Sequence, residues 1–268
     1  LIVFFSRFHF MSSTYTLLAV DPSLGKIDKA SLSQQTLMEL LINGITSNKD
    51  EICHSLETPR DIDEWNGVTL NGSGDITVVL WDDMQLEGSI NIQWLPTTIE
   101  SFSVSQNAIS QTIDLYLVPV GLVELDFSSN YLYGEIPLGD FPEGFVKLYL
   151  ESNRLSGTLD LEHLPQTMQY LYLNRNSFVG TVCLTHLPQS MKIVNLGDNS
   201  LTGCIDVTLL PLGLTQLHLK KNRFEGWTDF SMLPKALLEL NVSDTNLSGE
   251  MRVENRNSFV TEGSNVII

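Results

Sequence analysis

The residue types best suited to chemistry are cysteine and histidine, and their spacing predicts no catalytic or metal centre. Cys53, Cys183 and Cys204 fit neither a CxxC redox motif nor a zinc knuckle. His163 and His186 occur in two similar phrases, LEHLP and LTHLP, with Cys183 near the second, which raises the hypothesis of a metal site. A copied surface turn explains both histidines more simply. We therefore expect no catalytic residue, no metal and no cofactor.

The remaining motifs and the composition exclude several function classes. GxSxG, HExxH, P-loop and GxGxxG motifs are not found in a context that would support catalysis, so we expect a protein that is not an enzyme. The 268 residues contain 15 Lys and Arg against 32 Asp and Glu, a net charge of -17. Nucleic acids and anionic membranes attract cationic surfaces, so we expect neither as a partner. No stretch approaches the roughly 20 apolar residues of a membrane span.

A 23-residue period organises the chain from Val79 onward. Proline, asparagine and several apolar columns all recur at this interval. The markers are Pro96, Pro119, Pro142, Pro165, Pro188, Pro211 and Pro234, and Asn107, Asn130, Asn153, Asn176, Asn199 and Asn222. One unit of this length cannot bury its apolar side chains alone, so the units must stack and share one core.

Each unit predicts a short strand followed by a tight turn. In VKLYLESNRLSGTLDLEHLPQTM (146–168) the LxL alternation places both leucines inward and their neighbours outward. Strands of successive units would then form one parallel sheet along the inner wall. We expect each asparagine to pair with backbone groups of the turn. The glycine four residues later suits a bend that needs positive φ.

The unit LxxLxLxxNxLxGxIxLxxLPxx resembles the leucine-rich-repeat family over residues 79 to about 260, eight units. The resemblance implies an α/β repeat fold: a right-handed leucine-rich-repeat solenoid, or horseshoe, with a concave parallel β-sheet. WNGVTL (65–70) is similar to the N-terminal cap of plant-type repeats, although Ile62 and Leu70 stand where that family has cysteines. The full-length unit is also similar to protist families, kinetoplastid ones among them.

The sequence predicts four parts. Residues 1–30 are a leader or linker, 31–78 an N-terminal helix-hairpin cap, 79–260 eight leucine-rich repeats, and 261–268 a tail at which the chain is cut short. SQQTLMELLINGI (33–45) has helical apolar spacing, and two β-rich runs joined by NGSG (71–74) predict the hairpin. Neither a complete signal peptide nor a transmembrane segment is present, so cytoplasmic and surface or secreted locations both stay open. Oligomeric state and glycosylation at Asn71, Asn241 and Asn246 also stay open.

Outward residues of the inner sheet are the candidate ligand-binding surface. Tyrosines predominate in the middle, where they offer a large contact area with a polar tip, although tyrosine is also a good strand residue. Acidic residues lie on one side and basic residues on the other. The candidates are Tyr149, Tyr170, Tyr172, Asn174, Arg175, Asn195, His218 and Lys220.

The sequence thus predicts a non-enzymatic, receptor-like scaffold that binds a protein or peptide on its concave sheet. One alternative is the ligand-binding fragment of a larger surface receptor, antigen or signalling enzyme such as a kinase. Another is a glycan binder, because tyrosines stack on sugars. Fold resemblance alone does not identify the partner.

Overall fold

The computed structural model describes residues 28–55, 57–139, 141–251 and 258–268. The chain divides into two compact units, Leu1–Leu32 and Ser33–Ile268. Most of the expected leader lies outside the described residues. The described part of the first unit contains the 3-10 helix η1 (Lys29–Ser31), whose N-cap Asp28 accepts a hydrogen bond from the Ala30 amide at 3.0 Å.

The second unit begins with a helix and a hairpin. Helix α1 (Gln34–Leu41) starts at the N-cap Ser33 and buries Leu37, Met38 and Leu41. Three short elements follow: β1 (Ile45–Ser47), α2 (Lys49–Cys53) and the 3-10 helix η2 (Ile62–Glu64). Strands β2 (Val68–Leu70) and β3 (Ile76–Leu80) form the antiparallel hairpin. The helix and the hairpin agree with the sequence analysis.

Buried tryptophans anchor this first part of the second unit. Trp65 donates its indole N–H to the Arg60 carbonyl at 2.8 Å, and Trp81 donates to the Asn66 carbonyl at 2.9 Å. Both side chains are almost fully buried. Cys53, Cys183 and Cys204 are all free. Apolar packing and these two hydrogen bonds therefore stabilise the region where the resembled family has a disulfide.

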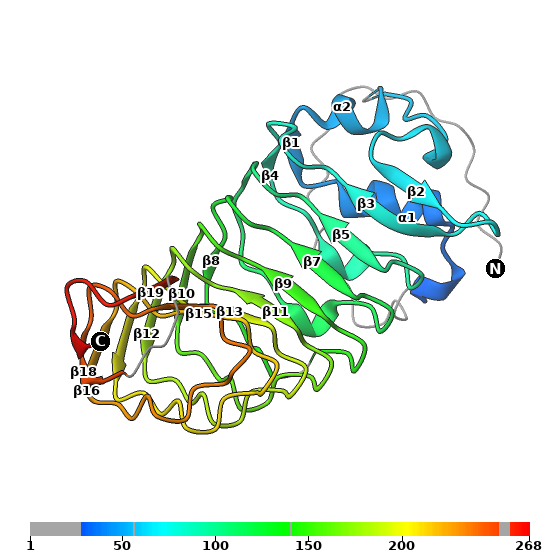
Figure 1. Ribbon diagram of the computed structural model, residues 1–268. Coiled ribbons are helices and arrows are strands. Elements are labelled where there is room, and N and C mark those ends of the chain that lie inside the picture. Colours follow the sequence, from blue (N-terminus) through cyan, green and yellow to red (C-terminus); the bar gives the residue numbers. More distant parts are fainter. Residues whose placement is uncertain (1–27, 56, 140, 252–257) are drawn as a thin grey trace, which may run out of the picture. The chain divides into compact units, whose positions relative to one another are not determined.

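A ten-stranded sheet runs the length of the solenoid (Figure 1). Its strand order is β19-β17-β15-β13-β11-β9-β7-β5-β3-β2, and every pair except β2–β3 is parallel. Each repeat contributes one three-residue strand with its middle residue buried or nearly so. The strands are β5 (Ser101–Ser103), β7 (Glu124–Asp126), β9 (Lys147–Tyr149), β11 (Tyr170–Tyr172), β13 (Ile193–Asn195), β15 (Gln216–His218), β17 (Glu239–Asn241) and β19 (Ser258–Val260).

A second parallel sheet, which the sequence analysis did not predict, follows the asparagine of each repeat. Its seven strands are β8 (Tyr133–Gly134), β10 (Arg154–Gly157), β12 (Ser177–Gly180), β14 (Ser200–Gly203), β16 (Arg223–Trp227), β18 (Asn246–Glu250) and β20 (Asn265–Ile267). Nearer the hairpin, β4 (Glu87–Gly88) joins β1 and β6 (Ala108–Ile109) in a three-stranded sheet. Since β20 pairs with β18, the segment expected to be a tail contributes a strand.

The fold is therefore a β-solenoid of about eight turns, and the helical half of the α/β expectation is weak. In the repeats, the described helices are two 3-10 turns, η3 (Ile92–Trp94) and η4 (Leu115–Leu117). The reason is chain length. A 23-residue unit that already supplies two strands and a proline corner retains too few residues for a helix of several turns.

The apolar columns form one continuous core between the sheets. Leu125, Leu148 and Leu171 occupy matching positions of successive strands and are fully buried. Phe102 lies in the same column and its ring is 5.6 Å from that of Phe127. Every repeat thus buries its side chains against its neighbours, as the stacking argument requires.

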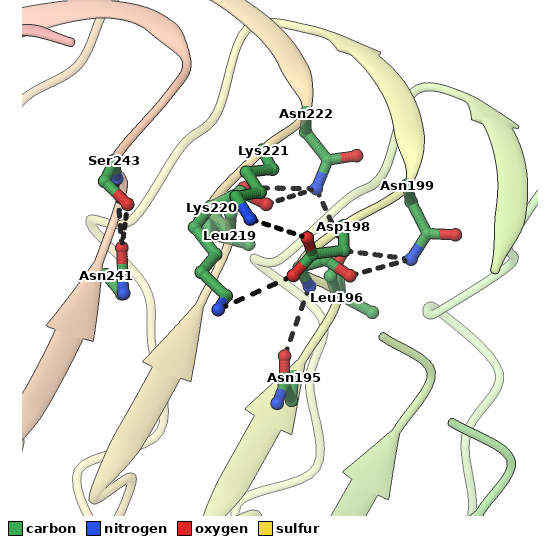
Figure 2. Close-up of polar contacts among 11 residues, drawn as sticks. Asn195, Leu196, Asp198, Asn199, Leu219, Lys220, Lys221, Asn222, Asn241 and Ser243 are labelled. Atoms are coloured by element: carbon green, nitrogen blue, oxygen red, sulfur yellow. Dashed lines mark hydrogen bonds and ion pairs between the residues drawn. The ribbon is translucent and has the colours of Figure 1, made fainter. Parts of the chain in front are cut away.

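A ladder of buried and partly buried asparagine side chains holds successive turns together. The Asn176 amide donates to the carbonyls of Leu150 at 2.9 Å, in the preceding repeat, and Leu173 at 3.1 Å, in its own. Its Oδ1 accepts from the Leu155 amide at 3.0 Å. Asn199 and Asn222 repeat the pattern (Figure 2). The structural role expected for this column is confirmed.

Asn176→Ala should lower the free energy of unfolding by about 1–2 kcal/mol, because it leaves a backbone N–H and two carbonyls, all in partly buried hydrogen bonds, without these partners. Urea unfolding followed by circular dichroism measures the effect. The matched control is Asn174→Ala in the same repeat, whose side-chain oxygen is buried without a hydrogen-bond partner. Equal losses in the two variants would contradict the ladder.

Candidate functional site

The predicted binding residues lie in register on the solvent-facing side of the ten-stranded sheet. Tyr149 pairs with Tyr172, which pairs with Asn195, which pairs with His218. Because the intervening Leu148, Leu171, Val194 and Leu217 face the core, these four side chains share the opposite side. All four are half-buried. They form a row across four adjacent strands, and we call the surface around it the sheet face.

Tyrosines occupy the centre of the sheet face. The rings of Tyr149 and Tyr172 lie 5.2 Å apart at an interplanar angle of 31°. Tyr170 is in register with Lys147 on one side and Ile193 on the other. Burial, with nearby Glu124 as the next cause, raises the pKa of Tyr149 to about 12. Burial also raises the pKa of Tyr172. Both phenols therefore keep their proton at neutral pH and can donate hydrogen bonds.

Carboxylates lie on the side of the tyrosines nearer the N-terminus. Glu124 pairs with Lys147 at 3.1 Å. Burial raises the pKa of Asp126, against hydrogen bonds from Ser128, whose amide lies 2.7 Å from Oδ1. Burial also raises the pKa of Glu151 to about 7; its own backbone N–H opposes the rise and Asp126 adds to it. One Glu151 oxygen is buried without a hydrogen-bond partner among the described residues.

Amide and basic side chains follow the tyrosines on the next strands toward the C-terminus, and Figure 2 shows Asn195 with Lys220 and Lys221 close to Asp198. Asn195 accepts a hydrogen bond from the Gly197 amide at 3.2 Å. Burial lowers the pKa of His218, against the opposing effect of Glu239, whose carboxylate is 3.5 Å from Nε2. Lys220 and Lys221 both approach Asp198, at 3.5 and 3.4 Å.

Three predicted residues lie beyond the strands: Asn174, Arg175 and Lys220, which is two residues past the end of β15. Asn174 lies two residues past Tyr172, and its carbonyl accepts from the Ser152 amide at 2.9 Å, so it stays beside Glu151 of the neighbouring repeat. Arg175 is exposed and adopts φ 56° in the turn before Asn176. Arg175 therefore belongs to the edge of the sheet face. The residue that the sequence analysis did not single out is Glu151, whose burial only the packed structure reveals.

The sheet face is suited to binding. It offers aromatic area, neutral phenol donors and charges of opposite sign on the two sides.

Among the described residues, no helix is long and apolar enough to cross a membrane.

Comparison with solved structures shows the leucine-rich-repeat fold. A plant ice-binding protein aligns with 18% identity and a TM-score of 0.63, covering 87% of this chain and 86% of its own. Pollen Receptor Kinase 3 aligns with 21% identity and a TM-score of 0.53, covering 76% of this chain and 95% of its own.

A third match is named as a leucine-rich-repeat ectodomain. It comes from the plant membrane receptor kinase GASSHO1/SCHENGEN3 of Arabidopsis thaliana and was solved in complex with CASPARIAN STRIP INTEGRITY FACTOR 2. The identity is 21% and the TM-score 0.54, over 87% of this chain and 36% of that one. No family model and no curated protein sequence matches the chain, so the similarity to protist families stays a prediction.

The raised pKa of Glu151 predicts a pH-dependent stability. Because the folded protein holds this proton up to about pH 7 while an unfolded glutamate releases it near pH 4.5, stability is lost as pH rises between these values. Glu151→Gln should remove this pH-dependent loss. We expect the loss to be on the order of 1 kcal/mol in the free energy of unfolding, a figure that allows for the partial solvent contact of the side chain. Unfolding midpoints measured from pH 4 to 8 test this. Parallel curves for both proteins would contradict the assignment.

Proposed function

We propose that this leucine-rich-repeat solenoid is a non-enzymatic recognition module that binds a protein or peptide on the sheet face. The observation that carries the proposal is the row of half-buried side chains from Tyr149 to His218, held in register by the parallel ladder. Tyrosines in such a row supply large contact areas at low entropic cost, which is why they are frequent in interaction hot spots. The GASSHO1/SCHENGEN3 complex supports a binding role, because the same fold carries a partner there.

The dimensions of the sheet face suit an extended peptide. Strands β7 to β15 are four intervals apart, or ~19 Å at the usual spacing of parallel strands. An extended chain covers this distance with about six residues. Such a length would reach from Asp126 to His218 across Tyr149 and Tyr172, with Tyr170 two residues to one side on the same strand as Tyr172.

Charge gives the peptide a preferred direction. Asp126 makes one side of the sheet face acidic, and Lys220 and Lys221 add positive charge on the other. Glu151 adds only a partial negative charge at neutral pH, because its pKa is raised to about 7. A ligand with a basic residue over the acids and an acidic residue over the lysines would be complementary, and the reversed ligand would be repelled at both ends. Asp198 partly neutralises the lysines, so both sides contribute modestly to this selectivity.

The matched receptor kinases favour a second possibility, that this module is the ligand-binding part of a larger receptor. This possibility concerns what the module is joined to, and it uses the same sheet face. The plant ice-binding protein shows that the fold also serves another purpose. Ice presents a repeating lattice, whereas the row on the sheet face changes from Asp126 through Tyr149 and Tyr172 to Asn195. We therefore favour a protein or peptide partner, and a thermal-hysteresis measurement tests the alternative.

Replacing Tyr149, Tyr170 and Tyr172 together by Ser should abolish binding of peptides selected from a random display library on the wild-type protein. The loss should exceed 100-fold in Kd, because three central aromatic contacts disappear at once. Cooperative unfolding by circular dichroism checks that the variant is folded.

The matched control changes Tyr131 and Tyr133 to Ser. Both tyrosines are exposed, at 45% and 50%; Tyr133 begins strand β8 of the second sheet and Tyr131 lies two residues before it. Tyr131 packs on Arg154 with 4.5 Å from the guanidinium carbon to the ring centre. This variant should bind like the wild type. If selected peptides bind the triple variant unchanged and lose affinity for the control, the binding surface is the second sheet.

A further inference from the structure

Three ligand types that metal ions prefer meet on the return loops of two successive repeats. Glu162 lies in the loop after β10, and Cys183 and His186 lie in the equivalent loop after β12. One carboxylate oxygen, Sγ and one imidazole nitrogen lie within 4.8 Å of one another. All three residues are partly or fully exposed, so an ion from solution can reach them. These loops lie outside the ten-stranded sheet and contribute no residue to the sheet face.

Two of the three distances between the ligand atoms match the edges of a tetrahedral site, and the third, between Cys183 Sγ and the Glu162 carboxylate, is within 4.8 Å. His186 Nδ1 lies 3.4 Å from Cys183 Sγ and 3.5 Å from Glu162 Oε1. With zinc bonds of about 2.3 Å to sulfur and about 2.05 Å to nitrogen and oxygen, tetrahedral geometry separates sulfur from nitrogen by about 3.5 Å and nitrogen from oxygen by about 3.4 Å. One atom, His186 Nδ1, satisfies both distances. An ion can therefore contact the two repeats with little movement of the imidazole.

The donor set selects the class of ion. A thiolate with an imidazole favours zinc and its neighbours in the first transition row, whereas magnesium and calcium require oxygen ligands. We propose that Glu162, Cys183 and His186 bind one zinc-class divalent ion through Oε1, Sγ and Nδ1, with the fourth position open to water or to a ligand from a partner. The Cys183 thiol loses its proton to solvent when it coordinates.

The preceding pair of repeats supplies an internal comparison. Asp160 and His163 stand one period before Cys183 and His186, and Gly139 stands one period before Glu162. There the two side chains form an ion pair at 2.7 Å between Oδ2 and Nδ1, and the third donor is missing. The histidine phrase is thus copied, as the sequence analysis held, but only the later copy gains a thiol and a carboxylate. This difference revises the expectation that the protein has no metal site.

Hydrogen bonding is the competing explanation for the cluster. Thr185 Oγ1 lies 3.2 Å from both Cys183 Sγ and His186 Nδ1. The same residues are therefore satisfied in part without an ion. A test therefore has to detect metal coordination itself, because hydrogen bonds already explain why these side chains lie close together.

Titration with Co²⁺ detects coordination through its absorption spectrum. The wild-type chain should develop a thiolate-to-cobalt charge-transfer band in the near ultraviolet and the visible bands of tetrahedral cobalt, and Zn²⁺ should displace both. Cys183→Ser should abolish the charge-transfer band. Glu162→Gln and His186→Gln should each weaken Co²⁺ binding by more than about tenfold, because changes outside the ligand shell alone cost about 10- to 100-fold.

Two control variants and a second measurement keep the test decisive. Cys204→Ser changes another exposed cysteine and His163→Gln the copied histidine, and both should retain the spectrum. Zn²⁺ should raise the unfolding temperature of the wild type and leave that of Cys183→Ser unchanged, because an ion that binds only the folded chain stabilises it. If the wild type gives no band that depends on Cys183, or if Cys204→Ser removes the band as well, the three residues form a hydrogen-bonded surface cluster only.

Discussion

The fold depends on how each turn satisfies its backbone once the chain leaves the ten-stranded sheet. The turn leaves N–H and carbonyl groups inside the solenoid, where an unpaired group costs about 1–3 kcal/mol. A carboxamide can both donate and accept, so one asparagine serves its own repeat and the one before it. At the end of the ladder Thr245 has a hydroxyl, which donates only to the Val242 carbonyl at 2.7 Å. The connection between repeats is therefore built into the same residue that shapes each turn.

The outward side chains of the sheet face are not needed to hold the fold together. The core is formed by inward leucines and the turns by asparagines, so the outward positions can differ from strand to strand without changing the fold. That freedom explains how Asp126, Tyr149 and Asn195 can occupy equivalent places. Some outward groups are nevertheless in an unfavourable environment. Glu151, for example, is half-buried beside Asp126 and has a raised pKa.

The period was enough to predict the repeated strands of the ten-stranded sheet, their register and which of their residues face outward. Leu148 and Leu171 identified the inward-facing side of the strands, and Asn176 identified the turn that follows each strand. The second sheet was missed because only three residues separate each asparagine from the glycine position that follows it, too few to show alternation. Arg175 was counted with the sheet face because its positive φ is not visible in the sequence. Glu162 was missed because it lies 21 residues before Cys183, a spacing that becomes adjacency only when repeats stack.

Nuclear magnetic resonance of tyrosine-labelled protein tests the central claim most directly. The chain has seven tyrosines; three lie on the sheet face, and Tyr131 and Tyr133 lie before and at the start of strand β8 of the second sheet. Adding a peptide selected on the wild-type protein should shift the ring signals of Tyr149, Tyr170 and Tyr172 and leave those of Tyr131 and Tyr133 in place. Shifts confined to Tyr131 and Tyr133 would contradict recognition by the ten-stranded sheet.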